Sequence, residues 1–284
     1  MKKLKYPLMM VLLGVALFGA SLALFTGGKS ASAAAAQTFY GDEGELQGGF
    51  TADGSALNAM NSDGSTPALA VSAGGDLWSA LIQDQRVVVK QFVTTTMSWS
   101  PKGTSPSSGV AASPAIGFRT DQPNSPWLAW SEGQNSPQMV KAAHFDGANW
   151  QAAGSLNVNL AATAQHVALA IGRTPSSTVP LPWVAWDEHA NNDHRAIIVK
   201  AALSDTTGPA GVTWQLIGDP LRVDAESDAM LPDLAFAGPG SSVPWLVWQE
   251  NNTTTTAIFA ARALTDVTAP GGLQWQPVGR SSGC

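Results

Sequence analysis

Apolar and polar positions alternate over short runs along the chain, and these runs recur in the same order from about residue 67 onward. Gly, Pro, Asn, Asp and Ser separate the runs, which is the pattern of β-strands joined by turns. The clearest unit has its runs at 114–118, 127–132, 139–145 and 149–154. Each unit is therefore predicted to be a four-stranded antiparallel sheet.

Tryptophans mark fixed positions within these units. The pattern W-[QS]-x-x-G, whose tryptophans are predicted to be structural, opens at Trp99, Trp150, Trp214 and Trp275. A second phrase, P-W-x-x-W-x-E, occupies residues 126–132, 182–188 and 244–250. Similarity at fixed offsets indicates copies of one structural unit. Because three is an odd spacing on a strand, the two tryptophans of the second phrase are expected on opposite faces.

Units of four short strands, repeated at roughly 50 to 65 residues, are typical of β-propeller blades. We predict an all-β fold, a β-propeller of four four-stranded blades over residues 67–284. The blades are placed at about 67–103, 113–155, 166–219 and 230–280. Four blades can close into a small ring, pair with a second chain, or be part of a longer array, so a homo-oligomer is one alternative if they do not close.

The N-terminus carries a targeting pattern. A basic start, M-K-K-L-K, precedes an uncharged run at residues 6–25 and small residues up to Ala36. We interpret 1–36 as a signal peptide or membrane anchor, and the Gly-, Asp- and Ser-rich segment 37–66 as a flexible linker. The protein is predicted to be exported, to the extracellular space, the cell surface or the outer membrane face. Because the apolar run is long enough to span a bilayer, a retained tether remains an alternative to cleavage.

Charge and cysteine content exclude some functions. The chain has 15 basic and 21 acidic residues, and four of the basic ones lie before position 30. The remainder is acidic and has no basic run, which argues against nucleic-acid binding. The single cysteine, Cys284, excludes an internal disulfide framework.

The repeats resemble those of secreted bacterial β-propeller proteins. Residues 146–150, D-G-A-N-W, also loosely resemble the Asp-box turn of sialidase-type blades. The resemblance implies the fold and no particular activity. Sialidases use a tyrosine nucleophile, whereas the two tyrosines here, Tyr6 and Tyr40, both precede the blades. A sialidase-type hydrolase is therefore not expected.

Candidate binding groups come from the second phrase, whose final tryptophan and glutamate recur in three blades. These are Trp130, Trp186 and Trp248 with Glu132, Glu188 and Glu250. The aromatic rings can either pack between blades or stack on sugars. The carboxylates can hold a cation or transfer protons, but we expect them to form cross-strand ion pairs with Lys141, Lys200 and Arg262.

Two polar segments suggest metals. His189, Asp193 and His194 share one predicted hairpin and offer a loose ligand set for zinc, although a polar hairpin tip is favoured. Residues 224–228, D-A-E-S-D, alternate oxygen ligands as calcium sites do, but lack the glycine and terminal glutamate of an EF-hand loop. No cofactor is predicted, and calcium is left open.

The chain contains no G-x-S-x-G, H-E-x-x-H, C-x-x-C or phosphate-binding glycine loop. We therefore predict no catalytic residues and an exported, non-enzymatic binding module for a glycan or a cell-surface protein. A membrane-tethered structural or assembly subunit is the alternative. A polysaccharide hydrolase or lyase is a third, and it requires one of Glu132, Glu188, Glu250 or Asp187 to matter more than its equivalents.

Overall fold

The computed structural model describes residues 57–59, 61–134, 137–175, 177–189, 194–203, 212–237, 241–251 and 255–278. The predicted signal or anchor at 1–36 lies outside these residues, as does most of the predicted linker. Among the helices of the described part, none is long and apolar enough to cross a membrane.

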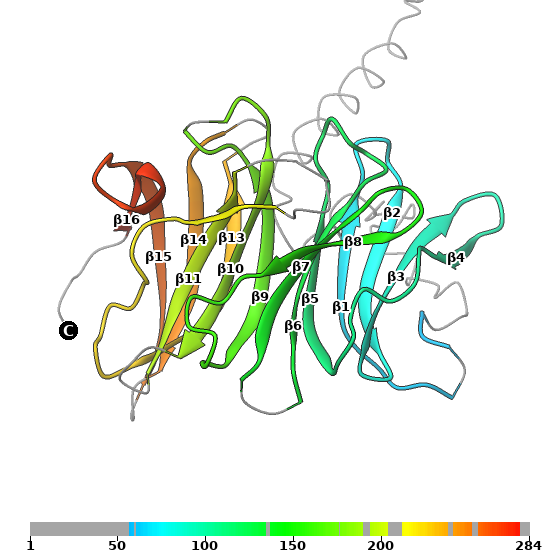
Figure 1. Cartoon of the computed structure of the whole chain (residues 1–284), viewed down its shortest axis with the longest axis horizontal. Helices are drawn as coiled ribbons and strands as arrows, with labels where there is room; N and C mark the ends of the chain where they lie inside the picture. Colours follow the sequence, from blue (N-terminus) through cyan, green and yellow to red (C-terminus); the bar gives the residue numbers. More distant parts are fainter. Residues whose placement is uncertain are drawn as a thin grey trace, which may run out of the picture.

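The described residues form four antiparallel four-stranded sheets, which confirms the predicted all-β propeller-type fold (Figure 1). Blade 1 contains β1 (Gly64–Val71), β2 (Leu77–Gln83), β3 (Arg86–Val93) and β4 (Ser98–Pro101). Blade 2 contains β5 (Ala111–Gly117), β6 (Trp127–Glu132), β7 (Met139–Phe145) and β8 (Trp150–Ser155). Blade 3 contains β9 (Ala164–Gly172), β10 (Leu181–His189), β11 (Arg195–Ala202) and β12 (Trp214–Leu216). Blade 4 contains β13 (Asp228–Phe236), β14 (Pro244–Asn251), β15 (Thr256–Thr265) and β16 (Leu273–Pro277), with the short 3-10 helix η1 (Pro270–Gly272) before β16.

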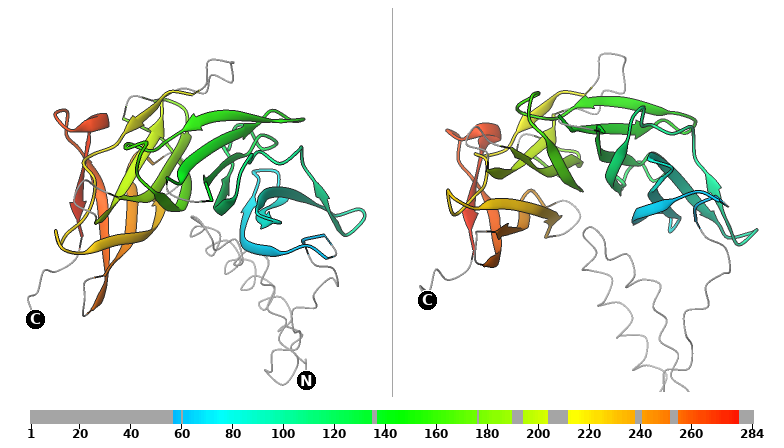
Figure 2. Two further views of the ribbon diagram at one scale, coloured as in Figure 1. Left: turned by 60° about the horizontal axis from the view of Figure 1, so that its bottom comes forward. Right: turned by 90° about the horizontal axis from the view of Figure 1, so that it is seen from below.

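The blades form an open arc (Figures 1 and 2). Their first strands, β1, β5, β9 and β13, pack side by side in chain order along the arc. The extensive contacts between strands of different blades, within the described residues, join consecutive blades only. We call the side of a blade that faces the next blade its trailing face, and the side that faces the preceding blade its leading face.

The first strand of each blade contains a β-bulge with one residue at positive φ. These residues are Thr66, Ser113, His166 and Leu231. Proline follows the bulge residue in blades 1, 2 and 4, which suits a bulge because proline cannot donate to the sheet ladder. Blade 3 has His166-Val167 instead, with valine where the other three blades have proline.

The hydrophobic core consists of three layers, one between each pair of consecutive blades. The first tryptophan of the repeated phrase fills the trailing face: Trp183 lies in the layer shared with blade 4. The second fills the leading face: Trp186 lies in the layer shared with blade 2. Strand alternation thus sends the two tryptophans to opposite neighbours.

Tryptophans on the fourth strands also join the blades by hydrogen bonds. The indole Nε1 groups of Trp150, Trp214 and Trp275 donate to the carbonyl oxygens of Lys102, Ala153 and Ile217, at 2.9, 2.8 and 2.9 Å. Each acceptor lies three residues after the equivalent tryptophan of the preceding blade. Trp99, in blade 1, instead lies against Phe92 with ring centroids 5.4 Å apart.

Blade 1 begins earlier than the predicted linker boundary. β1 starts at Gly64, inside the segment 37–66. The backbone N–H of Ala59 donates to Gln83 Oε1 at 3.0 Å, and that of Asp63 donates to Asp84 Oδ1 at 3.0 Å. These bonds tie the residues before β1 to the β2–β3 hairpin.

Candidate functional site

The predicted binding tryptophans and glutamates form three equivalent internal pairs. Each indole Nε1 donates to the carboxylate two residues later on the same strand face. The bonds join Trp130 to Glu132, Trp186 to Glu188, and Trp248 to Glu250, each at 2.8 Å.

The same carboxylates also bind the chain segment that connects the preceding blade to their own. Glu188 accepts the backbone N–H groups of Val158 and Asn159 at 3.1 and 2.5 Å. Glu250 accepts those of Val223 and Asp224 at 2.6 and 3.1 Å. Each glutamate therefore anchors an inter-blade connection by charge-assisted hydrogen bonds.

The strand register and the burial of these residues bear on two expectations. The residues directly opposite the glutamates across the hairpin are Met139, Ala196 and Ala257, so Lys141, Lys200 and Arg262 do not face them as expected. Lys141 and Lys200 still interact electrostatically with Glu132 and Glu188. Trp130, Trp186, Trp248, Glu188 and Glu250, which were predicted as binding residues, are all buried between blades in this structure. A buried ring has no face for a sugar, and a buried carboxylate already bonded to its own chain does not reach a ligand.

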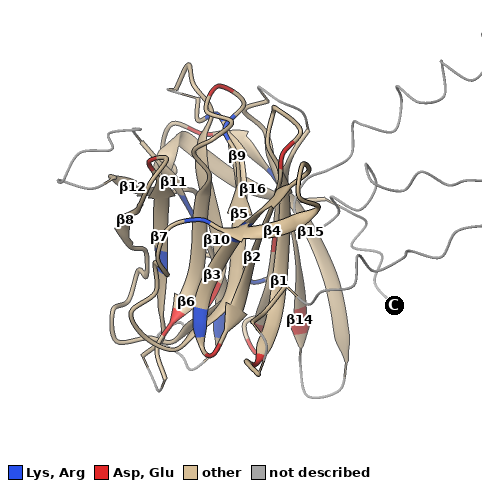
Figure 3. Ribbon diagram, turned by 90° about the vertical axis from the view of Figure 1, so that its right-hand side faces the viewer, with Lys and Arg blue, Asp and Glu red and all other residues tan. Residues whose placement is uncertain are grey.

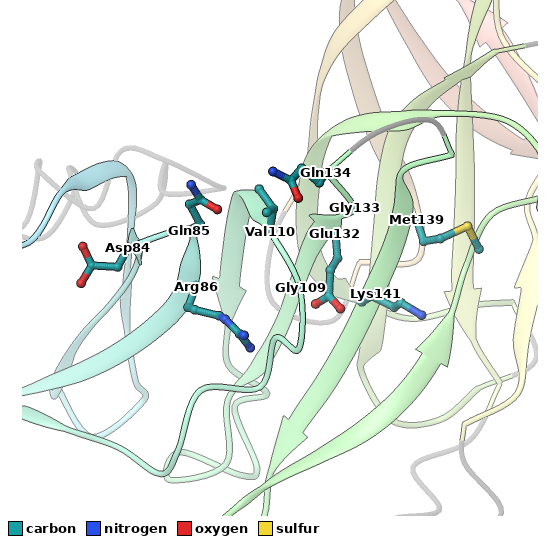
Figure 4. Close-up of a pocket in the computed structure, with 10 residues that line it drawn as sticks. All are labelled: Asp84, Gln85, Arg86, Gly109, Val110, Glu132, Gly133, Gln134, Met139 and Lys141. Atoms are coloured by element: carbon teal, nitrogen blue, oxygen red, sulfur yellow. The ribbon is translucent and has the colours of Figure 1, made fainter.

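Glu132 differs because it is only half-buried and borders a groove between blades 1 and 2 (Figure 4). The groove has a volume of about 580 Å³. The β2–β3 hairpin forms one wall, the β6–β7 hairpin the other, and the connection between the two blades forms the floor. The residues that line it are Asp84, Gln85, Arg86, Gly109, Val110, Glu132, Gly133, Gln134, Met139 and Lys141.

Both walls of the groove carry polar groups. Arg86 donates to the carbonyl oxygen of Ser107 at 2.9 Å, and Lys141 Nζ donates to Ser155 Oγ at 2.5 Å. The exposed side-chain amides of Gln85 and Gln134 have no hydrogen-bond partner within the described residues. Each amide offers both donors and an acceptor to a ligand.

The carboxylate of Glu132 is held in its ionised form. Burial tends to raise its pKa, but hydrogen bonds from the Ser108 hydroxyl, the Trp130 indole and the Ser108 backbone N–H outweigh burial, and the charge of Lys141 adds to them. The net effect is a pKa below the usual value. The groove therefore presents a fixed negative charge near the cations Arg86 and Lys141.

A second polar cluster lies where blade 3 meets blade 4. The carboxylate of Asp187, which is fully buried, contacts His166 Nδ1 at 2.6 Å and is hydrogen-bonded and ion-paired to Arg195. The backbone N–H of Leu231 approaches the same carboxylate at 3.4 Å. About one third of the His166 side chain is exposed, so the imidazole has a carboxylate on one side and solvent access on the other.

This cluster occurs in blade 3 only. The positions equivalent to His166 are Thr66, Ser113 and Leu231, and those equivalent to Asp187 are Ile82, Ser131 and Gln249. His166 is not among the residues predicted from the sequence, because no carboxylate lies near it along the chain. The signal that could have found it is the departure of two positions in one copy from the pattern of the other three.

The predicted metal ligands are only partly described, because Asp193 lies outside the described residues. His194 Nδ1 lies 3.4 Å from Asp228 Oδ1, and its Nε2 lies 4.0 Å from Glu226 Oε2. In the predicted calcium segment, Asp224 accepts the backbone N–H of Glu226 and the hydroxyl of Ser227, each at 3.0 Å. No group of three or more His, Cys, Asp or Glu among the described residues is arranged to hold a metal.

Comparison with known proteins finds similarity of structure. No family model matches the chain, and no curated protein matches it in sequence. A Hadza microbial sialidase superposes with a TM-score of 0.44 at 16% identity, covering 69% of this chain and 44% of that one. A lectin from Aleuria aurantia in complex with alpha-methyl-L-fucoside superposes with a TM-score of 0.43 at 14% identity, covering 78% of this chain and 62% of the lectin. The chain thus spans less than two thirds of either structure.

Proposed function

We propose that the protein is an extracytoplasmic binding module that takes a polar ligand, a glycan, in the groove between blades 1 and 2. The observation that supports this is the composition of the groove walls: the amides of Gln85 and Gln134, which have no partner among the described residues, lie beside charges of both signs. Pockets for apolar small molecules are lined mainly by hydrophobic side chains. A polar groove instead suits a ligand with many hydroxyl groups, each of which needs a donor or an acceptor.

The test is binding of the full chain to an array of glycans and cell-wall polysaccharides, with calcium and with chelator. Saturable binding is expected, and Gln85→Ala or Gln134→Ala should weaken it about tenfold, as the loss of one or two neutral hydrogen bonds predicts. Gln215→Ala is the matched control, because Gln215 lies on β12 of blade 3, away from the groove. Failure to bind any glycan, or equal loss in all three variants, would contradict the proposal. A chelator effect would assign calcium a role in the site.

A catalytic function is the second candidate, and the His166–Asp187 contact favours it. A carboxylate on Nδ1 fixes the orientation and tautomer of an imidazole and leaves Nε2 for proton transfer. In a polysaccharide hydrolase or lyase, His166 would be the acid or base and Asp187 the positioning residue. Glu250→Gln serves as the control, because Glu250 is buried in an internal pair.

We expect His166→Ala to lower polysaccharide turnover by about 10² or more if His166 is the acid or base. Asp187→Asn should lower turnover and alter its pH profile. Absence of turnover in the unmodified protein, or activity that survives His166→Ala, would leave the cluster with a structural role.

We also propose that the protein is exported, on the strength of the basic start and the apolar run at 6–25. N-terminal sequencing of the native protein distinguishes the two forms of this proposal. A mature N-terminus after Ala36 indicates cleavage. An intact N-terminus, together with recovery of the protein in the membrane fraction, indicates a tethered structural or assembly subunit. Recovery of the intact protein in the cytoplasm would contradict both.

A further inference from the structure

The two ends of the arc expose the two halves of an interface that the protein builds three times internally. Every inner junction joins a trailing face to the leading face of the following blade. The trailing face of blade 4 and the leading face of blade 1 have no such neighbour in the described part of the chain. The repeat allows each exposed residue to be compared with its buried equivalents.

The trailing face of blade 4 exposes apolar side chains, two of which have large apolar equivalents that are buried in every other blade. Trp245 is 37% exposed, whereas its equivalents Trp78, Trp127 and Trp183 are at most 2% exposed. Ile258 is 72% exposed, whereas its equivalents Val87, Val140 and Ile197 are fully buried. Val247 is 42% exposed, whereas Ala80, Ala129 and Ala185 at the same position are fully buried, and Val278 is 40% exposed.

The leading face of blade 1 is the complementary half. Leu69 is 36% exposed, whereas Ile116, Leu169 and Leu234, at the same position of the other blades, are buried against the preceding blade. Val71, which is 39% exposed, is equivalent to Phe118 and Phe236. Those two rings pack edge-on against the trailing tryptophans Trp78 and Trp183.

We propose that a second copy of this chain covers both faces, so that two four-bladed arcs close into one eight-bladed ring with twofold symmetry. Blade 4 of each copy would pack on blade 1 of the other, repeating the inner junctions. Propellers have four to eight blades, so two copies reach the upper end of that range and three would exceed it. The junction between blade 4 of one copy and blade 1 of the other occurs twice, and the two junctions close the ring, as a finite cyclic assembly requires. This inference concerns assembly and does not depend on the proposed ligand.

The contacts between consecutive blades of one chain predict the contacts at the junctions between two copies. Trp99 is the one tryptophan of its class without a carbonyl acceptor in the described residues, which contain no blade before blade 1. By the repeat, its acceptor is the carbonyl oxygen three residues after Trp275, which belongs to Val278. Trp99 of one copy would therefore donate to Val278 of the other, and Trp245 would lie against Val71 and Leu69.

The first test is the mass of the full chain in mild detergent, measured by light scattering with the detergent contribution removed. We expect twice the mass of one chain. Ile258→Asp should halve that mass without lowering the melting temperature of the resulting monomer, because Ile258 is already exposed there. Leu160→Asp is the control, because Leu160 is 65% exposed in the connection between blades 2 and 3; it should leave the mass unchanged.

A mixing experiment tests the pairing of unlike faces. Ile258→Asp and Leu69→Asp should each be monomeric alone, because each damages both junctions of the ring. Mixed, they should form a heterodimer through the one junction whose two faces are intact. A junction between two copies of the same face would not be restored by mixing.

Other outcomes would overturn the proposal. A monomeric chain whose melting temperature falls with Ile258→Asp would show that another part of the same chain covers the face. A dimer that survives both Ile258→Asp and Leu69→Asp would show association through a different surface, such as the apolar run at 6–25.

Discussion

Glu132, Glu188 and Glu250 show how one residue type serves the same purpose in three blades while its surroundings differ. Each accepts an indole N–H from its own strand and a backbone N–H from the preceding connection. Glu188 and Glu250 are buried, whereas Glu132 borders the groove. The sequence pattern located these residues, but their acceptor role depends on main-chain groups more than 20 residues away, which strand periodicity does not reveal.

The lowered pKa of Glu132 predicts an acid-dependent stability. A carboxylate whose folded pKa lies below its ordinary value of about 4.5 stabilises the fold above that pH, and this contribution is lost as the pH falls toward the folded pKa. At pH 7, Glu132→Gln should lower the free energy of unfolding by about 1–2 kcal/mol. The difference from the unmodified protein should shrink between about pH 5 and pH 3.

Urea unfolding at several pH values measures this difference. Gln134→Glu is a useful control, because it adds a carboxylate to the groove without the bonds from Ser108 and Trp130. A penalty for Glu132→Gln that stays constant with pH would show that the carboxylate charge is not the stabilising feature.

His166 and Asp187 set the limit of prediction from the sequence at this scale. They lie 21 residues apart, and the strand bulge at His166 brings them together. Strand alternation predicts the sheet face on which each side chain lies. A bulge inserts one extra residue, so the side chains beyond it lie on the opposite face from the one that simple alternation predicts. The proline after three of the four bulges marks their location in the sequence, and blade 3 lacks that mark.

At the scale of the strand, the fourth strand of each blade is short but is fixed by its tryptophan. β12 has only three residues, and Trp214 Nε1 donates across the junction to Ala153. Alternating polarity predicted the long inner strands well, because their two faces pack on neighbouring blades. The alternation did not predict which groups accept the indole N–H bonds, because each acceptor lies in another blade, 48 to 61 residues away.

Trp214→Phe tests this cross-blade bond. Phenylalanine keeps an aromatic ring but lacks the N–H, so the variant should lose about 1 kcal/mol for the hydrogen bond, plus a contribution from the smaller ring. Thermal or urea unfolding measures the loss. Trp99→Phe in the monomeric Ile258→Asp background should cost less, because Trp99 has no described acceptor there; an equal cost would show that ring packing, and not the bond, dominates.

At the scale of the molecule, four blades in a row behave as a short linear array. Within the described residues, blades 2 and 3 have a neighbour on both faces, whereas blades 1 and 4 have one. The repeat count was readable from the sequence because tryptophans recur at fixed offsets. The open arc was not, because closure depends on the angle between blades, which no residue pattern encodes. Most of the ribbon in Figure 3 is tan, so Lys, Arg, Asp and Glu occupy few positions on the strands in that view.

Hydrogen exchange should report this arrangement directly. In a linear array, the terminal units open more readily than the inner ones. In the monomeric Ile258→Asp variant, amides of β14 and β2 should exchange faster than those of β6 and β10. In the unmodified chain at high concentration, the amide exchange rates of the four strands should become more alike. Dilution should restore the difference between these rates. Equal protection of all four strands in the monomer would contradict the array description.

The bond from Ala59 to Gln83 repeats the way each glutamate holds an incoming connection, so blade 1 is already prepared to receive chain from a preceding blade. Val278, at the other end, occupies the position from which such a connection departs in blades 1 to 3. A segment as short as residues 102–108 would therefore suffice to connect Val278 of one copy to Ala59 of the next copy in a single fused polypeptide. The fused polypeptide would hold one of its two closing junctions covalently, and the melting temperature of the complete ring would no longer depend on protein concentration.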